Sequence, residues 1–192
     1  MRPDDEVEVE PGSLLVAAPS LNDPNFSRTV VYIIDQRPEG TLGVVLNRPS
    51  EVAVHDVLPP WGSHVTKPQC IYVGGPVEQK TALCLAALKV GTDPSTVEGL
   101  VGVQGPVALV DLDAEPDDLM PLVRGLRVFA GYSGWGEGQL QGEIDRGDWI
   151  VVTGLADDVL TGANVDLWGR VLRRQGMPLA LLSTYPKDVR DN

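Results

Sequence analysis

Glycine and proline interrupt this chain along its whole length, with 21 glycines and 16 prolines among 192 residues. Their combined share exceeds average usage. Because glycine favours turns and proline ends helices and strands, the regular elements should be short and joined by many turns. Hydrophobic residues make up 43% and charged residues 22%, which excludes a fully disordered chain, a coiled coil and a collagen-like repeat. The length predicts one domain, large enough to fold without a disulfide or a metal.

Three apolar segments near the N-terminus predict strands, at residues 14–18, 29–34 and 41–46. Their connections are too short for a helical crossover, so we expect an antiparallel meander. The acidic residues 1–11 before it are expected to be a disordered lead. The domain is predicted to span residues 12–185, with a flexible tail at 186–192.

The rest of the chain predicts short strands and several helices. Residues 49–69 contain five prolines and glycines and are expected to be mostly loop, with one helical turn at 53–58. Strands are expected at 71–73, 107–111, 126–130 and 149–152, and helices at 115–124, 138–145 and 164–175. Since strands come first and do not alternate regularly with helices, the pattern favours an α+β fold over a doubly wound sheet.

Residues 81–89 are ambiguous. Their alanines and leucines favour a helix, but their uniform apolarity between turn residues is typical of a buried strand, which we favour.

The formal net charge of −12 disfavours direct binding to nucleic acid or to anionic lipid. The only dense basic cluster is Arg170, Arg173 and Arg174. No apolar run is long enough for a membrane span, and residues 1–10 do not resemble a secretory signal. We therefore expect a cytoplasmic protein in which Cys70 and Cys84 are buried thiols.

Metal and cofactor chemistry find little support. His55, His64, Cys70 and Cys84 are spread too far along the chain for a typical zinc site, and neither a dinucleotide nor a phosphate-loop pattern is present. The run from Gly131 to Gly136 approaches the G-x-S-x-G pattern of serine hydrolases, but Trp135 occupies the fifth position and both histidines lie upstream. We predict no metal, no cofactor and no catalytic residue.

The strongest candidate site is the glycine-rich stretch around Tyr132, Ser133 and Trp135. Its glycines suggest positive φ angles or close backbone approach, and the helix expected after it offers free N–H groups. Gln139 and Glu143 are spaced to share one helix face. The alternative is structural: a tight strand-to-helix turn with Trp135 packed in the core.

Polar groups at strand ends extend this candidate site, because binding residues often collect there. Arg28 precedes a predicted strand, Asn47 and Arg48 follow one, and Gly74 and Gly75 end another. The alternative for Arg28 is an ion pair with Asp23. The full candidate ligand-binding set is Arg28, Asn47, Arg48, Gly74, Gly75, Tyr132, Ser133, Trp135, Gln139 and Glu143.

Four motifs follow one another along the chain: GSLLVAAPSLNDPNFSRTVVYI at 12–33, GTLGVVLNRP at 40–49, GGPV at 74–77 and GYSGWGEGQLQGEI at 131–144. Together they resemble the AlgH-like bacterial family, also known as YqgE-like, an uncharacterised protein family. The resemblance implies a mainly antiparallel, bent and bifurcated sheet that forms a pseudo-barrel with helices outside it, and a strand after GGPV. Members often carry a histidine near the end of that strand, where this chain has 84–88, CLAAL.

These observations favour a regulatory module that binds a small ligand or a protein of unknown identity. The first alternative is an enzyme acting on a small anionic or amide substrate, with Ser133, Gln139 and Glu143 as its polar set and Arg48 as an anion clamp. The second is a transcriptional regulator that contacts DNA through Arg170, Arg173 and Arg174. The oligomeric state is left open.

Overall fold

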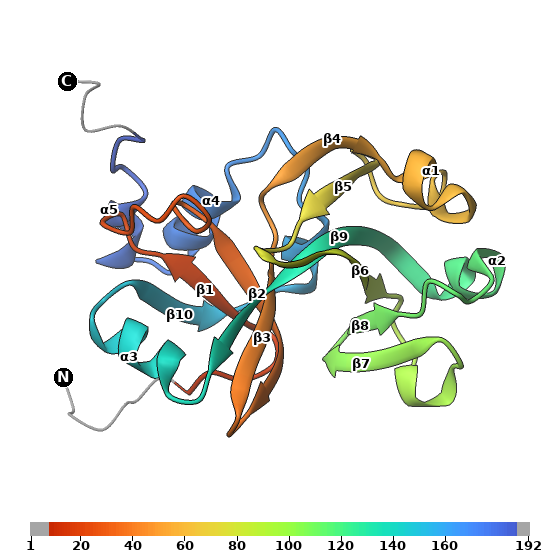
Figure 1. Cartoon of the computed structure of the whole chain (residues 1–192), viewed down its shortest axis with the longest axis horizontal. Helices are drawn as coiled ribbons and strands as arrows, with labels where there is room; N and C mark the ends of the chain where they lie inside the picture. Colours follow the sequence, from red (N-terminus) through yellow and green to blue (C-terminus); the bar gives the residue numbers. More distant parts are fainter. Residues whose placement is uncertain (1–7, 188–192) are drawn as a thin grey trace.

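The computed structural model describes residues 8–187, which form a strongly curved ten-stranded sheet with short helices around it (Figure 1). The strands are β1 (Ser13–Ala17), β2 (Val30–Arg37), β3 (Gly40–Val45), β4 (Pro49–Ala53), β5 (Cys70–Val73), β6 (Val77–Leu88), β7 (Leu100–Gln104), β8 (Val107–Val110), β9 (Val123–Gly136) and β10 (Trp149–Thr153). The helices are α1 (Val54–Val57), α2 (Pro116–Leu119), α3 (Gln139–Asp145), α4 (Leu167–Arg174) and α5 (Leu179–Leu182).

The long strand β9 is the axis on which the sheet divides. The main strand order is β10-β1-β2-β3-β9-β6-β8-β7. Strand β6 pairs along one edge of β9, while β3 and β5 share the other edge at different heights. Ser133 to Gly136 pair antiparallel with β3, and Phe129 and Ala130 pair parallel with β5. The sheet is therefore bifurcated and curls into a half-barrel, which confirms the α+β fold that the resemblance implied.

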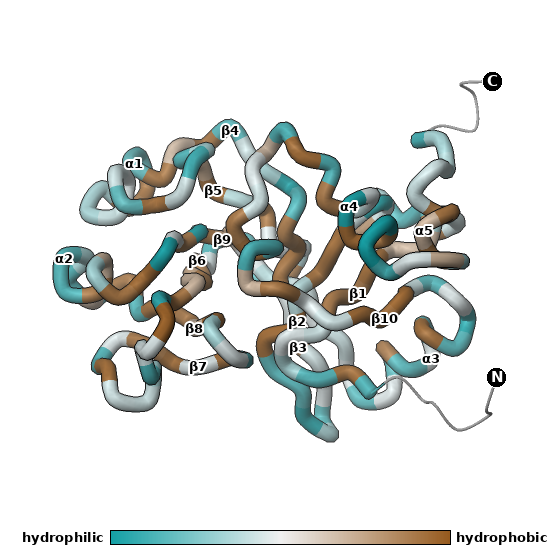
Figure 2. Tube along the Cα trace, turned by 180° about the vertical axis from the view of Figure 1, so that it is seen from behind, coloured by the Kyte–Doolittle hydropathy of each residue, from teal (hydrophilic) through white to brown (hydrophobic). Residues whose placement is uncertain are grey.

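Three apolar clusters fill the two sides of this sheet. The largest lies under α4 and includes Leu14, Phe129 and Trp168. A second lies between β5, β6, β8 and β9 and includes Trp61 and Cys84. The third lies against α3. Seen from behind, β1, β2 and β10 are mostly hydrophobic (Figure 2), as expected for strands covered on both faces.

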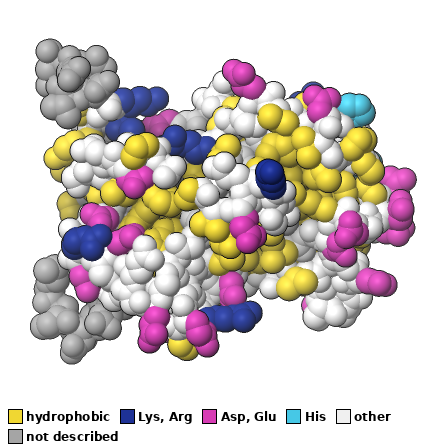
Figure 3. All heavy atoms as spheres, viewed as in Figure 1, with side chains coloured by type: hydrophobic (Ala, Val, Ile, Leu, Met, Phe, Trp, Pro, Cys, Tyr) yellow, Lys and Arg dark blue, Asp and Glu magenta, His cyan; other side chains and the backbone are white. Residues whose placement is uncertain are grey.

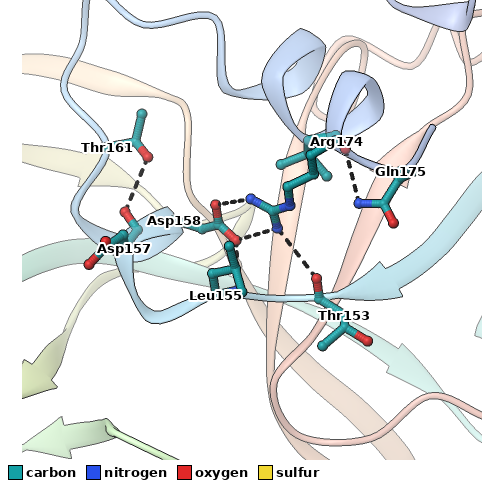
Figure 4. A network of polar contacts seen from close by, with 8 residues as sticks. Thr153, Leu155, Asp157, Asp158, Thr161, Arg174 and Gln175 are labelled. Carbon is teal, nitrogen blue, oxygen red and sulfur yellow. Dashed lines mark hydrogen bonds and ion pairs between the residues drawn. The ribbon is translucent and has the colours of Figure 1, made fainter. Parts of the chain in front are cut away.

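An ion pair between a buried carboxylate and a partly exposed arginine attaches α4 to the sheet (Figure 4). Both terminal nitrogens of Arg174 donate to the Asp158 carboxylate, at 2.6 and 2.7 Å, and one also donates to the carbonyl of Thr153 on β10 at 3.3 Å. Asp158 is 3% exposed and also accepts the N–H of Leu155. This paired geometry compensates the cost of burying the carboxylate.

Arg127 on β9 is a buried cation, only 1% exposed. Its guanidinium lies 4.3 Å from the centre of the Tyr72 ring and donates to the carbonyls of Thr161 and Lys67. Burial lowers the pKa of Arg127. This side chain joins β9 to two loops that are distant in sequence.

Most predicted strands are confirmed, including the meander β1-β2-β3. The ambiguous segment 81–89 is a strand, the C-terminal part of β6. Three elements were not predicted: β4 and β7, which are largely exposed, and α5, which has only four residues. Short exposed strands lack the apolar alternation that a sequence pattern detects.

Two predictions were wrong. The expected helix 115–124 is α only at Pro116–Leu119 and ends in a 3-10 turn, because Pro121 cannot donate the hydrogen bond that would continue it. The alternative given for Gly131 to Gly136 was right that Trp135 packs in the core but wrong about a turn, because this stretch is the end of β9, paired with β3.

The predicted acidic lead and tail lie partly outside the described residues. Of the lead, Val9 packs against the third apolar cluster, and Glu10 exchanges hydrogen bonds with Ser13.

Candidate functional site

The predicted corner around Trp135 is closed by its own side chains. Trp135 is 5% exposed, and its indole nitrogen donates to Glu143 Oε2 at 2.8 Å. The indole of Trp149 donates to the same oxygen at 2.8 Å. The ring of Phe26 lies 6.0 and 5.5 Å from the two indole rings. Gln139 accepts the backbone N–H of Gly136 at 3.0 Å, so Trp135, Gln139 and Glu143 satisfy one another.

Gly74, Gly75 and Ser133 lie where the sheet divides. A Cβ on Gly74 would lie 2.4 Å from the carbonyl oxygen of Gly131, and one on Gly75 would lie 2.2 Å from the backbone of Tyr132. The buried Ser133 hydroxyl donates to the carbonyl of Gly74 at 3.1 Å. These glycines allow the backbone between β5 and β6 to approach β9 closely where the sheet divides.

The polar strand ends hold the loop before β2. Asn47 accepts the N–H of Val30 and donates to the carbonyl of Arg28. The Arg28 guanidinium lies 3.9 Å from the centre of the Trp168 ring and donates to the carbonyl of Tyr185 at 3.0 Å. Asp23, the alternative partner of Arg28, instead accepts the N–H of Asn25. The structure therefore brings the candidate residues into three separate clusters rather than one.

An open groove lies between β6 and the segment formed by β4 and α1, which we call the arm. Phe129 and Ala130, in the middle of β9, also line it. We call it the valine groove. Its apolar part has a volume of about 470 Å³ and is lined by Ser50, Val52, Val57, Ile71, Val73, Gln79, Lys80, Thr81, Ala82, Phe129 and Ala130. Val52, Val57 and Val73 are 47%, 54% and 36% exposed. In Figure 3, hydrophobic side chains gather over this region.

A smaller cavity of about 290 Å³ adjoins the apolar part and shares Val73 and Gln79 with it. We call it the Arg48 cavity; it is also lined by Pro24, Asn25, Val45, Arg48, Pro49, Gly75 and Pro76. Two predicted residues, Arg48 and Gly75, therefore lie in this site.

The groove exists because the pairing of β6 with β9 is interrupted. Val77 pairs with Tyr132, but pairing resumes only at Ala82, opposite Ala130. Glu78 within this bulge has a φ of 45°, a conformation uncommon outside glycine. Such bulges bend a strand and redirect its side chains. The bulge leaves the side chains of Gln79 to Ala82 exposed along one wall of the groove.

The charges that line the two cavities are both positive. Lys80 lines the apolar part and Arg48 lines the Arg48 cavity, and no carboxylate is among their lining residues. One terminal nitrogen of Arg48 donates to the carbonyl of Ser27 at 2.7 Å, which fixes the half-buried side chain in the cavity wall. The chain as a whole has a net charge of −12, so the cavities carry the opposite charge to the rest of the protein.

Three further observations concern the described residues. Within residues 8–187, no three His, Cys, Asp or Glu side chains lie close enough to hold a metal ion. No helix in that range could span a membrane. Burial raises the pKa of the Cys84 thiol, which lies in the second apolar cluster.

Sequence reasoning missed the valines of the groove: Val52 lies in a segment assigned to loop, Val57 in a predicted helical turn and Val73 in a predicted strand. The one available indication was Val52 and Val57 in a proline-rich stretch assigned mostly to loop. Gln79 and Lys80 gave no indication, since exposed polar residues are ordinary in any surface segment.

Comparison with known proteins gives consistent matches along the chain. A family model described as AlgH-like matches residues 14–180. A UPF0301 protein of Mycolicibacterium vanbaalenii is 56% identical over 184 residues, covering 96% of this chain and 92% of its own. One of Rhodococcus opacus is 56% identical over 187 residues, covering 97% and 93%.

Two solved structures are similar. A crystal structure from Corynebacterium diphtheriae has a TM-score of 0.90 at 44% identity and covers 93% of each chain. The solution structure of the AlgH protein from Pseudomonas aeruginosa has a TM-score of 0.68 at 23% identity, covering 97% of this chain and 98% of its own. The second likeness shows the fold alone.

Proposed function

The chain belongs to the AlgH-like family, and we propose that within it this protein is a regulatory binding module whose valine groove holds an extended apolar segment of a partner protein. The observation that supports this most is the exposure of Val52, Val57 and Val73 along one open groove. Contiguous exposed apolar surface of this kind is typical of interaction sites.

The second apolar cluster reaches the surface in this groove. Ile71 belongs to that cluster and Ala130 packs against it, and both line the groove. At the other end of the cluster, α2 covers the core through the buried Leu119. A partner side chain placed over the three valines would complete the same core, with a gain of about 25 cal/mol for each Å² of apolar surface buried.

The groove fits a peptide segment better than a small molecule. Sites for small ligands enclose most of their ligand, whereas Val52 and Val57 on the arm are about half exposed. An extended segment can place alternate side chains on such a surface while its backbone stays near solvent. The Ser133 hydroxyl, proposed as part of an enzyme site, is fully buried and donates to a backbone carbonyl, which favours binding over catalysis.

The test is selection from a phage-displayed library of random 12-residue peptides on the full chain. Binding of the synthesised peptides is then measured by fluorescence polarisation on the wild type and on the double variant Val52→Asp, Val57→Asp. Because we propose that the protein is cytoplasmic, as the sequence predicts, these measurements use a reducing buffer near neutral pH. We expect affinity to fall by at least about tenfold, since each 1.4 kcal/mol is a factor of ten.

The matched control is Val101→Asp on the edge strand β7, where the valine is 64% exposed but does not line the groove. It should bind the peptides like the wild type. A library that yields no binder, or binders that the double variant retains at wild-type affinity, would refute the proposed function.

A further inference from the structure

We propose that the Arg48 cavity is a carboxylate subsite, so that the segment held in the valine groove carries a carboxylate next to its apolar side chains. This inference rests on the proposed function and adds the chemical class of the ligand. The carboxylate can be the C-terminus of the partner or an acidic side chain, and the experiment below separates the two.

The position of Arg48 supports this assignment. Its hydrogen bond to Ser27 uses one terminal nitrogen. Within residues 8–187, no other hydrogen bond or ion pair is found for its guanidinium. The remaining donors are thus available to a ligand in the cavity that Arg48 lines. A guanidinium held at one end presents a planar fork that matches the two oxygens of a carboxylate.

The other groups around the cavity are compatible with an anion. Asn25 and Gln79 line it and carry amide donors. Three acidic residues lie within two residues of the lining in sequence: Asp23, Glu51 and Glu78. Asp23 accepts the N–H of Asn25, and Glu78 accepts the Thr81 hydroxyl at 3.5 Å. None of the three carboxylates lines the cavity. Gly75, which also lines it, has no side chain to obstruct a ligand.

The shared lining fixes the spacing of the ligand groups. Val73 and Gln79 belong to both cavities, so the carboxylate and the apolar anchor must be close neighbours in the bound segment. An extended chain advances about 3.3 Å per residue, which places the carboxylate within roughly one to three residues of the anchor. Lys80 on the apolar side adds attraction at longer range.

The experiment uses the same peptide library in two display formats, one with free C-termini and one with the C-terminus fused to the phage coat. Each selected peptide is synthesised as its free acid, as its C-terminal amide and with acidic side chains replaced by amides. Kd is measured for the wild type, Arg48→Gln, Arg48→Lys and the control Lys89→Gln. Lys89 is exposed and lines neither cavity.

We expect removal of one carboxylate to weaken binding by about 10- to 100-fold, the usual strength of a hydrogen bond to a charged group. Arg48→Gln should lower the affinity of the acidic peptide to that of its amide form, and Arg48→Lys should recover part of the loss. Lys89→Gln should leave binding unchanged. Loss on C-terminal amidation identifies a C-terminus, and loss on side-chain replacement identifies an acidic residue. Thermal unfolding of each variant verifies that it is folded.

Peptides that require Val52 and Val57 but bind equally well without any carboxylate, or equally well to Arg48→Gln, would overturn the subsite and leave the proposed function standing. Absence of any groove-dependent peptide would overturn both. A concentration-dependent dimer on size exclusion that Val52→Asp, Val57→Asp abolishes would show that a second copy occupies the groove and would also overturn the subsite.

Discussion

Two parts of β9 border regions of opposite character. At the C-terminal end of β9, which pairs with β3, Trp135, Trp149 and Phe26 pack together and the buried indoles share the Glu143 carboxylate. In the middle of β9, which pairs with β5, Val52 and Val57 remain exposed along an open groove. The first region is rich in glycine and aromatic residues but closed. The second is ordinary in composition but leaves part of the core uncovered, and the comparison teaches that an unusual motif in the sequence does not by itself indicate an open site.

The largest effect is expected at the point that joins the two regions. In Gly75→Ala the new Cβ would meet the backbone of Tyr132 at 2.2 Å, and backbone cannot yield as a flexible side chain does. We expect a loss of at least about 3 kcal/mol in the free energy of unfolding, measured by urea denaturation.

The control for this variant is Gly142→Ala in α3, where no atom lies within 4 Å of the added carbon. It should be neutral or stabilising by up to about 1 kcal/mol. If Gly75→Ala were equally well tolerated, the division of the sheet would not be the tight joint described above.

The closed region should depend strongly on Glu143. In Glu143→Ala the indole N–H groups of Trp135 and Trp149 lose their acceptor. Because an unsatisfied buried donor costs about 1–3 kcal/mol, we expect a loss of about 3 kcal/mol. Glu143→Gln keeps a carbonyl acceptor and should lose about half as much or less. Groove peptides should bind both variants with wild-type Kd; a shared loss of binding would show that the two regions are not separate.

Alkaline pH should weaken the fold through Tyr32 of the largest apolar cluster, which is 2% exposed. Burial, assisted by the charge of Asp158, raises the pKa of Tyr32 above its ordinary value of 10.0. The unfolded chain therefore loses this proton first, so the stabilisation is complete below pH 10 and is lost as pH rises through and beyond that value.

The free energy of unfolding is expected to fall by up to about 1.4 kcal/mol per pH unit as the pH rises. Urea titrations at a series of pH values from 9 upward measure this slope. Tyr32→Phe should flatten the slope. Part of it should remain, because burial also raises the pKa of Tyr72. A slope identical in the wild type and the variant would contradict this assignment.

The smallest effect is expected in the groove itself. Val52→Ser and Val57→Ser should each change the free energy of unfolding by no more than about 0.5 kcal/mol, as is usual for exposed positions. Val31→Ala on β2, where the valine is fully buried, should cost about 2 kcal/mol. Chemical denaturation of the three variants tests the contrast, and a large loss at Val52 or Val57 would mean that the groove side chains serve the fold.

The sequence allowed most of the sheet to be predicted because buried strands carry dense β-branched residues, as at Val30 to Ile34. The turn predicted at Gly131 to Gly136 failed for a non-local reason. Glycine usually indicates a turn, but here it allows β9 to contact Gly74 and Gly75, nearly 60 residues earlier. Local patterns cannot distinguish a glycine needed for bending from one needed for close approach.

The candidate site, too, could be predicted from the sequence only in part. Arg48 was recognisable as a polar residue at a strand end, and the structure places it in the wall of a cavity. Val52 and Val57 gave only a weak indication in the sequence, and the groove that they form with Lys80 became visible only once the arm and the bulge of β6 were brought together. Such a surface is a product of tertiary structure, so no spacing rule along the chain could have found it.

The central position of β9 has a consequence for how the protein is made. Ribosomes release the chain from its N-terminus, so β1 to β8 emerge before Val123, where β9 begins. Until then β3, β5 and β6 lack the strand that each of them pairs with, and unpaired edges invite aggregation. The nascent chain therefore passes through a vulnerable interval that ends only when its last third is synthesised, and any chaperone assisting it is expected to act in that interval.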